Sequence, residues 1–150
     1  MAIHIYETTT FLNVDLDIYS KSDLEPLVTA LGKKVLVCYV GLDRRTYVAH
    51  LELASGNPKS ADAAIRRFCV LIGALPKAAR ELWDTAKTRE FNIGVRAATQ
   101  PYSWEMALSC ETVEAAAKLK ARIGFTVYAP EVSKKIVRKK RASASGKTAL

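Results

Sequence analysis

The chain has 150 residues, of which 49% are apolar and 25% are charged. This composition excludes collagen-like, low-complexity and membrane-spanning chains, and the length suffices for one hydrophobic core without metals or disulfides. The net charge of +8 is concentrated in residues 132–150, which contain seven basic residues and no acidic one. We therefore expect a single globular domain over residues 1–131 and a basic, disordered tail over residues 132–150.

Residues 11–19 alternate between apolar and polar side chains, and Asp15 and Asp17 share the polar side. This alternation predicts a half-buried strand. The pattern Ser-Asp-Leu-Glu at 22–25 is typical of a capping box and predicts a short helix, which should end at Gly32.

The next elements should form a strand pair. Residues 34–40 contain a continuous apolar run, which predicts a central strand buried on both faces. Residues 46–53 alternate again and predict the returning strand of a hairpin.

A long helical region follows at 61–87, where apolar residues recur every three or four positions. Ser60 is its expected N-cap, and Pro76 should break it into two segments.

Two further strands are predicted at 91–97 and 102–108, then a helix capped by Ser109 and a closing strand at 125–129. These strand–helix–strand units predict an α/β fold of the α+β type. It should be a two-layer sandwich with a mixed sheet of about six strands and three helical segments on one face.

No catalytic, metal or cofactor site is predicted. His4 and His50 are far apart in the sequence, and His50 should face solvent or a neighbouring side chain. Cys110 at a helix start is the best candidate nucleophile, but Glu111 and Glu114 oppose formation of its thiolate. An enzyme would need a site that sequence spacing does not reveal, and a pocket that contains Cys110 together with His50 would support one.

A protein-binding surface is one interpretation of Asp15 and Asp17, with Glu105 beside them if the strand at 102–108 pairs nearby. The alternative is that these carboxylates belong to the solvated side of an amphipathic sheet.

The tail has three open interpretations: a solvated end without a partner, a contact for acidic proteins or membrane surfaces, or a nucleic-acid contact. Basic side chains would bind phosphates without sequence preference. The candidate residues for that contact are Lys134, Lys135, Arg138, Lys139, Lys140 and Arg141.

The compartment is predicted to be the cytoplasm. The N-terminus does not resemble a secretory signal, and no apolar run is long enough for membrane insertion. Of the three cysteines, Cys38 and Cys69 are expected to be small core residues with free thiols.

Three segments carry a resemblance to a known family: Arg-Glu-Phe-Asn-Ile-Gly-Val at 89–95, Tyr-Ser-Trp-Glu-Met-Ala-Leu-Ser at 102–109, and Phe-Thr-Val-Tyr-Ala-Pro at 125–130. With Glu114, they resemble an uncharacterised family of small bacterial α/β proteins over residues 11–131. The family has no assigned activity, so the resemblance implies no catalytic residue. It favours a non-enzymatic protein-binding or accessory domain, of an immunity-like kind, with nucleic-acid association through the tail as the alternative.

Overall fold

The computed structural model describes residues 8–56 and 58–130. The described residues form one five-stranded mixed sheet and four α-helices, rather than six strands and three helical segments. The strands are β1 (Thr10–Ser20), β2 (Val35–Asp43), β3 (Thr46–Leu53), β4 (Thr88–Arg96) and β5 (Arg122–Tyr128). The helices are α1 (Glu25–Leu31), α2 (Ala61–Gly73), α3 (Lys77–Asp84) and α4 (Cys110–Lys118), with a short 3-10 turn at Gly32–Lys34. The predicted α+β class is therefore confirmed, while the predicted tail lies outside the described residues.

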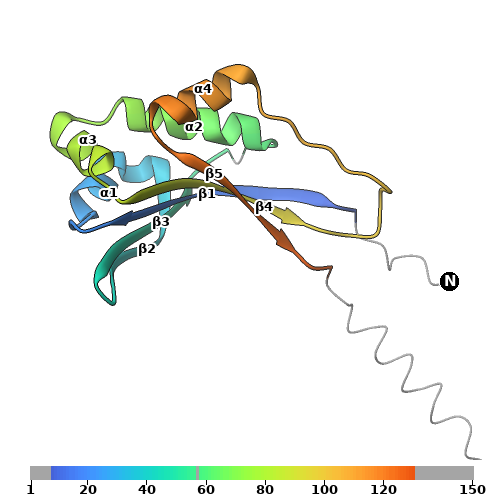
Figure 1. Cartoon of the computed structure of the whole chain (residues 1–150), viewed down its shortest axis with the longest axis horizontal. Helices are drawn as coiled ribbons and strands as arrows, with labels where there is room; N and C mark the ends of the chain where they lie inside the picture. The colour runs from blue at the N-terminus through green and yellow to red at the C-terminus, as the bar shows by residue number, and fades with distance from the viewer. Residues whose placement is uncertain (1–7, 57, 131–150) are drawn as a thin grey trace, which may run out of the picture.

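The strand order is β2-β3-β1-β4-β5, with all neighbours antiparallel except β4 and β5. The helices lie on one face of this sheet, and the opposite face is not covered by any described element (Figure 1). Apolar side chains from all four helices join those of the sheet in one buried cluster. This cluster explains why each strand turns one set of alternate residues toward the helices.

β1 is the centre of the sheet and follows the predicted alternation. Leu16 and Ile18 are fully buried beneath the helices, whereas Asp15 and Asp17 are half-buried on the other face. Because antiparallel pairing on both sides fixes the register of β1, the face of each of its residues is set by the helices that cover Leu16.

The strand predicted at 34–40 is not central. It corresponds to β2, which lies at one edge of the sheet and pairs only with β3. Leu36 and Val37 are 52% and 47% exposed. The apolar run therefore reflects an edge strand with uncovered apolar side chains, which periodicity alone cannot distinguish from a buried strand.

No strand forms at 102–108, so that prediction is wrong. The segment 97–109 leads from β4 to α4 without regular structure, and Tyr102 within it is fully exposed. The physical reason is topological: β4 and β5 are parallel, so the chain must return to the opposite end of the sheet before β5 begins.

The helix boundaries confirm four predictions, including the end of α1 at Gly32, and correct one. The Ser60 and Ser109 side chains accept hydrogen bonds from the Ala63 and Thr112 amides, as expected for N-caps. The helical region is interrupted around Pro76. The capping box at 22–25 does not form, since α1 begins at Glu25 and the Asp23 side chain accepts from the Glu25 amide.

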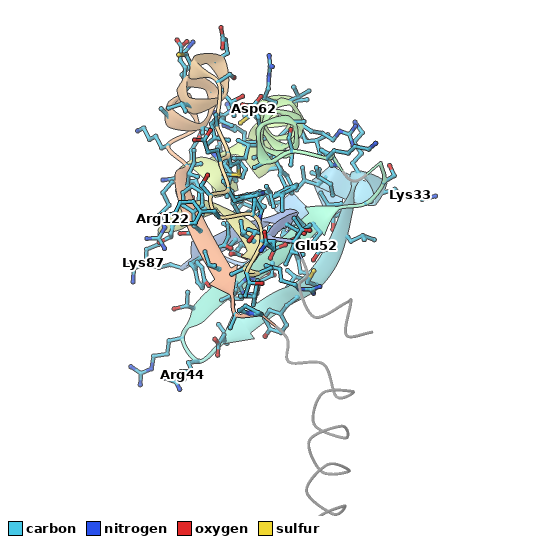
Figure 2. The ribbon with its side chains drawn as sticks, turned by 90° about the vertical axis from the view of Figure 1, so that its right-hand side faces the viewer. Lys33, Arg44, Glu52, Asp62, Lys87 and Arg122 are labelled. Atoms are coloured by element: carbon cyan, nitrogen blue, oxygen red, sulfur yellow. The ribbon has the colours of Figure 1, made fainter. Side chains whose placement is uncertain are left out.

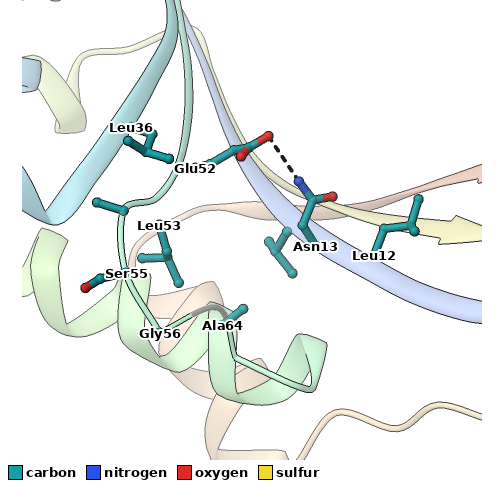
Figure 3. Close-up of a pocket in the computed structure, with 10 residues that line it drawn as sticks. Leu12, Asn13, Leu36, Glu52, Leu53, Ser55, Gly56 and Ala64 are labelled. Atoms are coloured by element: carbon teal, nitrogen blue, oxygen red, sulfur yellow. Dashed lines mark hydrogen bonds between the residues drawn. The ribbon is translucent and has the colours of Figure 1, made fainter.

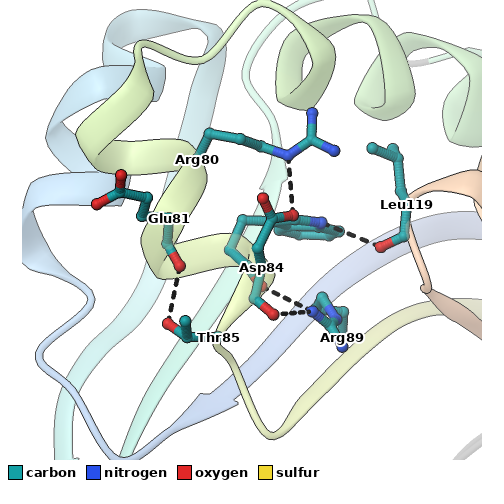
Figure 4. A network of polar contacts seen from close by, with 7 residues as sticks. Arg80, Glu81, Asp84, Thr85, Arg89 and Leu119 are labelled. Carbon is teal, nitrogen blue, oxygen red and sulfur yellow. Dashed lines mark hydrogen bonds and ion pairs between the residues drawn. The ribbon is translucent and has the colours of Figure 1, made fainter.

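Polar contacts join α3 to the sheet and to the end of α4 (Figure 4). The indole of the fully buried Trp83 donates to the Leu119 carbonyl at 3.1 Å. The Arg89 guanidinium donates to the carbonyls of Trp83 and Asp84, which end the helix. The Trp83 carbonyl also accepts from the Ala86 amide, so Arg89 adds a second donor at the end of the helix and ties α3 to the sheet. In the described part of the chain, no helix is both long enough and apolar enough to cross a membrane.

Candidate functional site: the open face of the sheet

The uncovered face of the sheet, termed here the open face, is lined by the alternate residues that point away from the helices. Most of them are polar. They comprise Asn13, Asp15, Asp17 and Tyr19 of β1, Val48, His50 and Glu52 of β3, Leu36 and Tyr39 of β2, Glu90 and Asn92 of β4, and Arg122 and Thr126 of β5. Figure 2 shows Glu52 within the sheet and Asp62 in the helical layer above it.

One row of side chains crosses all five strands in register. It runs from Arg122 through Glu90, Asp17 and His50 to Tyr39. Asp17 and Glu90 are directly opposite each other, an arrangement that destabilises a sheet when both charges are uncompensated. Here each carboxylate has its own partner on the outer side, since Asp17 contacts His50 and Glu90 contacts Arg122.

The Asp17 carboxylate lies 2.5 Å from Nδ1 of His50. Because an ionised carboxylate only accepts hydrogen bonds, the proton must sit on Nδ1, which fixes the tautomer of the ring. The Tyr19 ring meets the imidazole edge-on, with a centroid distance of 5.9 Å. His50 therefore faces a neighbouring side chain, as predicted, and is held in one orientation.

Glu90 occupies space that a glycine leaves free. A Cβ atom at Gly124 would lie 2.8 Å from Cδ of Glu90, which is closer than atoms normally approach. The Glu90 carboxylate accepts hydrogen bonds from Arg122 and from the Asn92 amide. The Asn92 carbonyl oxygen in turn accepts from the Thr126 hydroxyl. This half of the open face is a satisfied polar network.

The neighbouring row is different, because its carboxylates have no basic partner among residues 8–56 and 58–130. The Asn13 amide donates to Asp15 at 2.9 Å and to Glu52 at 3.2 Å. None of the ion pairs among the described residues includes Asp15 or Glu52. We call Asn13, Asp15 and Glu52 the acidic row.

Burial and repulsion by nearby carboxylates raise the pKa of Asp15. Desolvation, followed by the nearby carboxylates of Glu52 and Asp17, raises the Asp15 pKa from 3.8 to about 6. His50 and the hydrogen bond from Asn13 oppose this rise without cancelling it. The Asp15 carboxylate is therefore held at a position where a further positive charge would be stabilising.

A cleft of about 610 Å³ opens beside the acidic row (Figure 3). It forms where the pairing of β1 with β3 ends at Leu16, so that the first half of β1 pairs only with β4. In Figure 3 the hydrogen bond from Asn13 to Glu52 spans the rim of this cleft. The apolar side chains that line it are Leu12, Val14, Leu36, Leu53, Ala54 and Ala64.

The three cysteines are free thiols and lie in different environments. Cys38 was predicted to be a core residue, but it is exposed at a bulge of β2. Desolvation and the nearby Glu52 and Asp15 carboxylates raise its pKa. Cys69 is half-buried, which raises its pKa to about 11. Cys110 begins α4 in the helical layer, whereas His50 lies on the open face, so these two residues do not form a catalytic pair.

Within residues 8–56 and 58–130, no three His, Cys, Asp or Glu side chains are arranged to hold one metal ion. The carboxylates of Asp15 and Glu52 lie beside the apolar cleft, so the two surfaces together can contact a group that joins a positive charge to an apolar stem.

The opposite end of the open face is basic. Arg44, Lys87 and Arg122 line a cleft of about 400 Å³ together with Tyr19 and Asp43. Figure 2 shows Arg44, Lys87 and Arg122 projecting toward the same side of the molecule. Charge is thus divided along β1, from carboxylates around Asp15 to basic groups around Tyr19.

Of the residues predicted for protein binding, Asp15 and Asp17 share the open face as expected. Glu105 does not belong to a strand that pairs beside them. It lies exposed in the irregular segment 97–109. The predicted basic residues between Lys134 and Arg141 lie outside the described residues.

Sequence reasoning missed Asn13 and Glu52. Both alternate with apolar neighbours, which was the available signal for their face. Their contact with Asp15 depends on the order of the strands, which alternation does not contain.

Comparisons with models of known protein families, with curated proteins and with solved structures find no significant match. The resemblance to small bacterial proteins therefore stays a prediction.

Proposed function

We propose that this chain is a non-enzymatic protein-binding domain whose open face binds a basic segment of a partner protein. A Lys or Arg side chain of the partner would place its charge on Asp15 and Glu52 and its aliphatic stem in the neighbouring cleft. The observation that carries this proposal is the acidic row, in which two carboxylates share one neutral donor at the rim of an apolar cleft.

Two physical arguments support a polypeptide ligand. Long basic side chains combine an apolar stem with a charged head, and the cleft and the acidic row offer these two surfaces side by side. The edge strand β2 also exposes Leu36 and Tyr39 on the open face, where they extend the apolar contact area. The resemblance to small bacterial proteins adds an accessory, immunity-like role in the cytoplasm to the proposal.

The test uses a fluorescent peptide of alternating Lys and Val as the probe. To keep the chain's own basic residues from competing, all seven in 132–150 are replaced by Gln, which gives the neutral-tail variant. We expect this variant to bind the probe in fluorescence anisotropy. Adding Asp15→Asn and Glu52→Gln should weaken binding about tenfold, since two partly exposed charge pairs at about 0.7 kcal/mol each are lost.

The matched control is Glu81→Gln with Glu111→Gln, which removes the same charge from exposed positions of the helical layer. It should leave binding of the probe unchanged. A peptide of alternating Glu and Val should not bind. Equal losses from the two double variants would show that only net charge matters, and the open face would no longer be the proposed site.

Nucleic-acid association remains the second candidate, because seven basic residues without an acid are concentrated in 132–150. The acidic row would repel phosphates, so this binding would have to use the tail. A short single-stranded oligonucleotide should then bind the full chain and not the neutral-tail variant. Binding that survives neutralisation would remove the tail from this candidate function.

A further inference from the structure

We infer that the chain's own segment 134–141 occupies the acidic row and its cleft in the absence of a partner. This inference rests on the proposed function, because it assigns a resident occupant to the same surface. A partner protein would then have to displace the segment before it binds.

The segment 134–141 combines apolar and basic residues, as the apolar cleft and the neighbouring carboxylates require. It reads Lys-Lys-Ile-Val-Arg-Lys-Lys-Arg, so two apolar residues are flanked on both sides by basic ones. The surface presents an apolar cleft, lined by Leu12, Val14 and Leu53 among others, with the carboxylates of Asp15 and Glu52 at its rim. Ile136 and Val137 therefore fit the cleft while the basic residues reach the carboxylates.

The chain leaves the sheet at the acidic end. Tyr128, the last residue of β5, pairs with Arg96 of β4, which in turn pairs with Thr10 of β1. The acidic row lies a few residues further along β1, so the lateral and axial distances combine to roughly 20 Å. An extended chain covers about 3.3 Å per residue, so six residues bring Lys134 to the carboxylates.

Because the segment 134–141 is covalently joined to the domain, even a weak contact with the acidic row can be populated. A segment joined to its site by a short connection has an effective concentration on the order of millimolar, which favours the contact within one molecule over the same contact between molecules. Charge contributes as well, since every charged residue of the segment is positive and no ion pair among the described residues includes Asp15 or Glu52.

Two exposed cysteines allow a direct measurement, because Cys38 lies beside the acidic row and Cys110 lies in the helical layer. A nitroxide is attached to Cys38 in a Cys110→Ser chain, and broadening of the amide NMR signals of 134–141 is recorded. We expect strong broadening, which disappears in about 1 M salt, where charges are screened beyond about 3 Å. A nitroxide on Cys110 in a Cys38→Ser chain is the control and should broaden none of these signals.

Absence of broadening from Cys38 would overturn the inference, and so would equal broadening from both cysteines. Mixing a nitroxide-labelled chain with an unlabelled, isotope-enriched chain distinguishes a contact within one molecule from a contact between two copies. Broadening within the enriched chain would place the segment on a second copy, which contradicts occupation by the chain's own segment. Attachment at Cys38 leaves Asp15 and Glu52 unchanged in sequence, so the charges under test remain.

The peptide probe gives an independent measurement that distinguishes this inference from the proposed function. We expect the Lys–Val probe to bind the full chain about tenfold more weakly than the neutral-tail variant, because the segment competes for the same surface. Equal affinity for both chains would overturn the inference and leave the proposed function intact. Failure of the neutral-tail variant to bind the probe would overturn the proposed function, whatever the NMR measurement shows.

Discussion

The two faces of the sheet use neighbouring residues of the same strands for different purposes. On the covered face, Leu16, Ile93 and Phe91 are fully buried among the helices. On the open face, Asp15 and Asn92 lie one position away and remain half-buried and polar. The two-residue period of a strand thus separates the residues that form the core from those of the proposed binding surface, so each set can be changed with little effect on the other.

The open face is itself divided. In the row through Glu90 and Asp17 each carboxylate contacts a basic side chain, Arg122 or His50, whereas no ion pair among the described residues includes a carboxylate of the acidic row. Carboxylates that contact a basic side chain help to hold the sheet together, whereas carboxylates without such a contact are available to a ligand. For this reason the proposed binding site is Asp15 with Glu52, and Asp17 is assigned to the structure of the face.

The largest expected effect is the difference in stability between substitutions at two neighbouring residues of β4, one on the covered face and one on the open face. Ile93→Ala should lower the free energy of unfolding by about 3 kcal/mol, because it leaves a cavity in the core. Asn92→Ala should lower it by no more than about 1 kcal/mol, because it removes only hydrogen bonds at a half-buried surface. Urea unfolding of the two variants measures both values. Similar losses would show that the open face carries as much stability as the core.

A smaller effect concerns two carboxylates with opposite pH behaviour. The raised pKa of Asp15 means that the folded state holds its proton more tightly, so stability should fall as the pH rises from about 4 to about 6. The Ser109 amide lowers the pKa of Asp62 in the helical layer, so its stabilisation should be lost as the pH falls through that lowered pKa. In the neutral-tail variant at neutral pH, Asp15→Asn should therefore be stabilising, by about 1 kcal/mol after allowance for screening by water.

Thermal unfolding between about pH 4 and about pH 7 checks this prediction, with the window set by the Asp15 pKa of about 6. Asp62→Asn is the matched comparison and should be destabilising at neutral pH, since the carboxylate it removes accepts the Ser109 amide at 2.8 Å. A destabilising Asp15→Asn would show that the contact from Asn13 outweighs the desolvation of Asp15.

The smallest effect is a difference in thiol reactivity across the two faces. Cys38 and Cys110 are both exposed, but nearby carboxylates and desolvation raise the Cys38 pKa. Cys110 should therefore react several-fold faster with an aromatic disulfide reagent at neutral pH. Neutralising Asp15 and Glu52 should speed the reaction of Cys38 and leave that of Cys110 unchanged. Single-cysteine variants resolve the two rates.

Much of the local structure could be predicted from the sequence. The caps at Ser60 and Ser109, the interruption at Pro76 and the alternation of β1 depend on a few neighbouring residues, which a sequence displays directly. Errors arose where local pattern and tertiary position disagree, as at 34–40 and 102–108. An apolar run occurs in edge and central strands alike, and an apolar segment between two parallel strands need not join the sheet.

The candidate site was predicted only in part. Asp15 and Asp17 were assigned to one face because two residues of spacing on a strand guarantee it. The choice between them required Glu52, His50 and Glu90, which come from other strands. A sequence does not contain strand order or register, so it cannot tell which carboxylate will meet a base.

By itself the sequence determined the class of fold, the alternation of the central strand and the separation of charge between a nearly neutral body and a basic end. These properties follow from composition and from the periods of helix and strand. Only the tertiary structure decided that Asp15 and Glu52 share one neutral donor beside an apolar cleft. The reason is physical: that arrangement is made by the splaying of β1 from β3, and such a gap exists only when strands distant in the sequence are placed side by side.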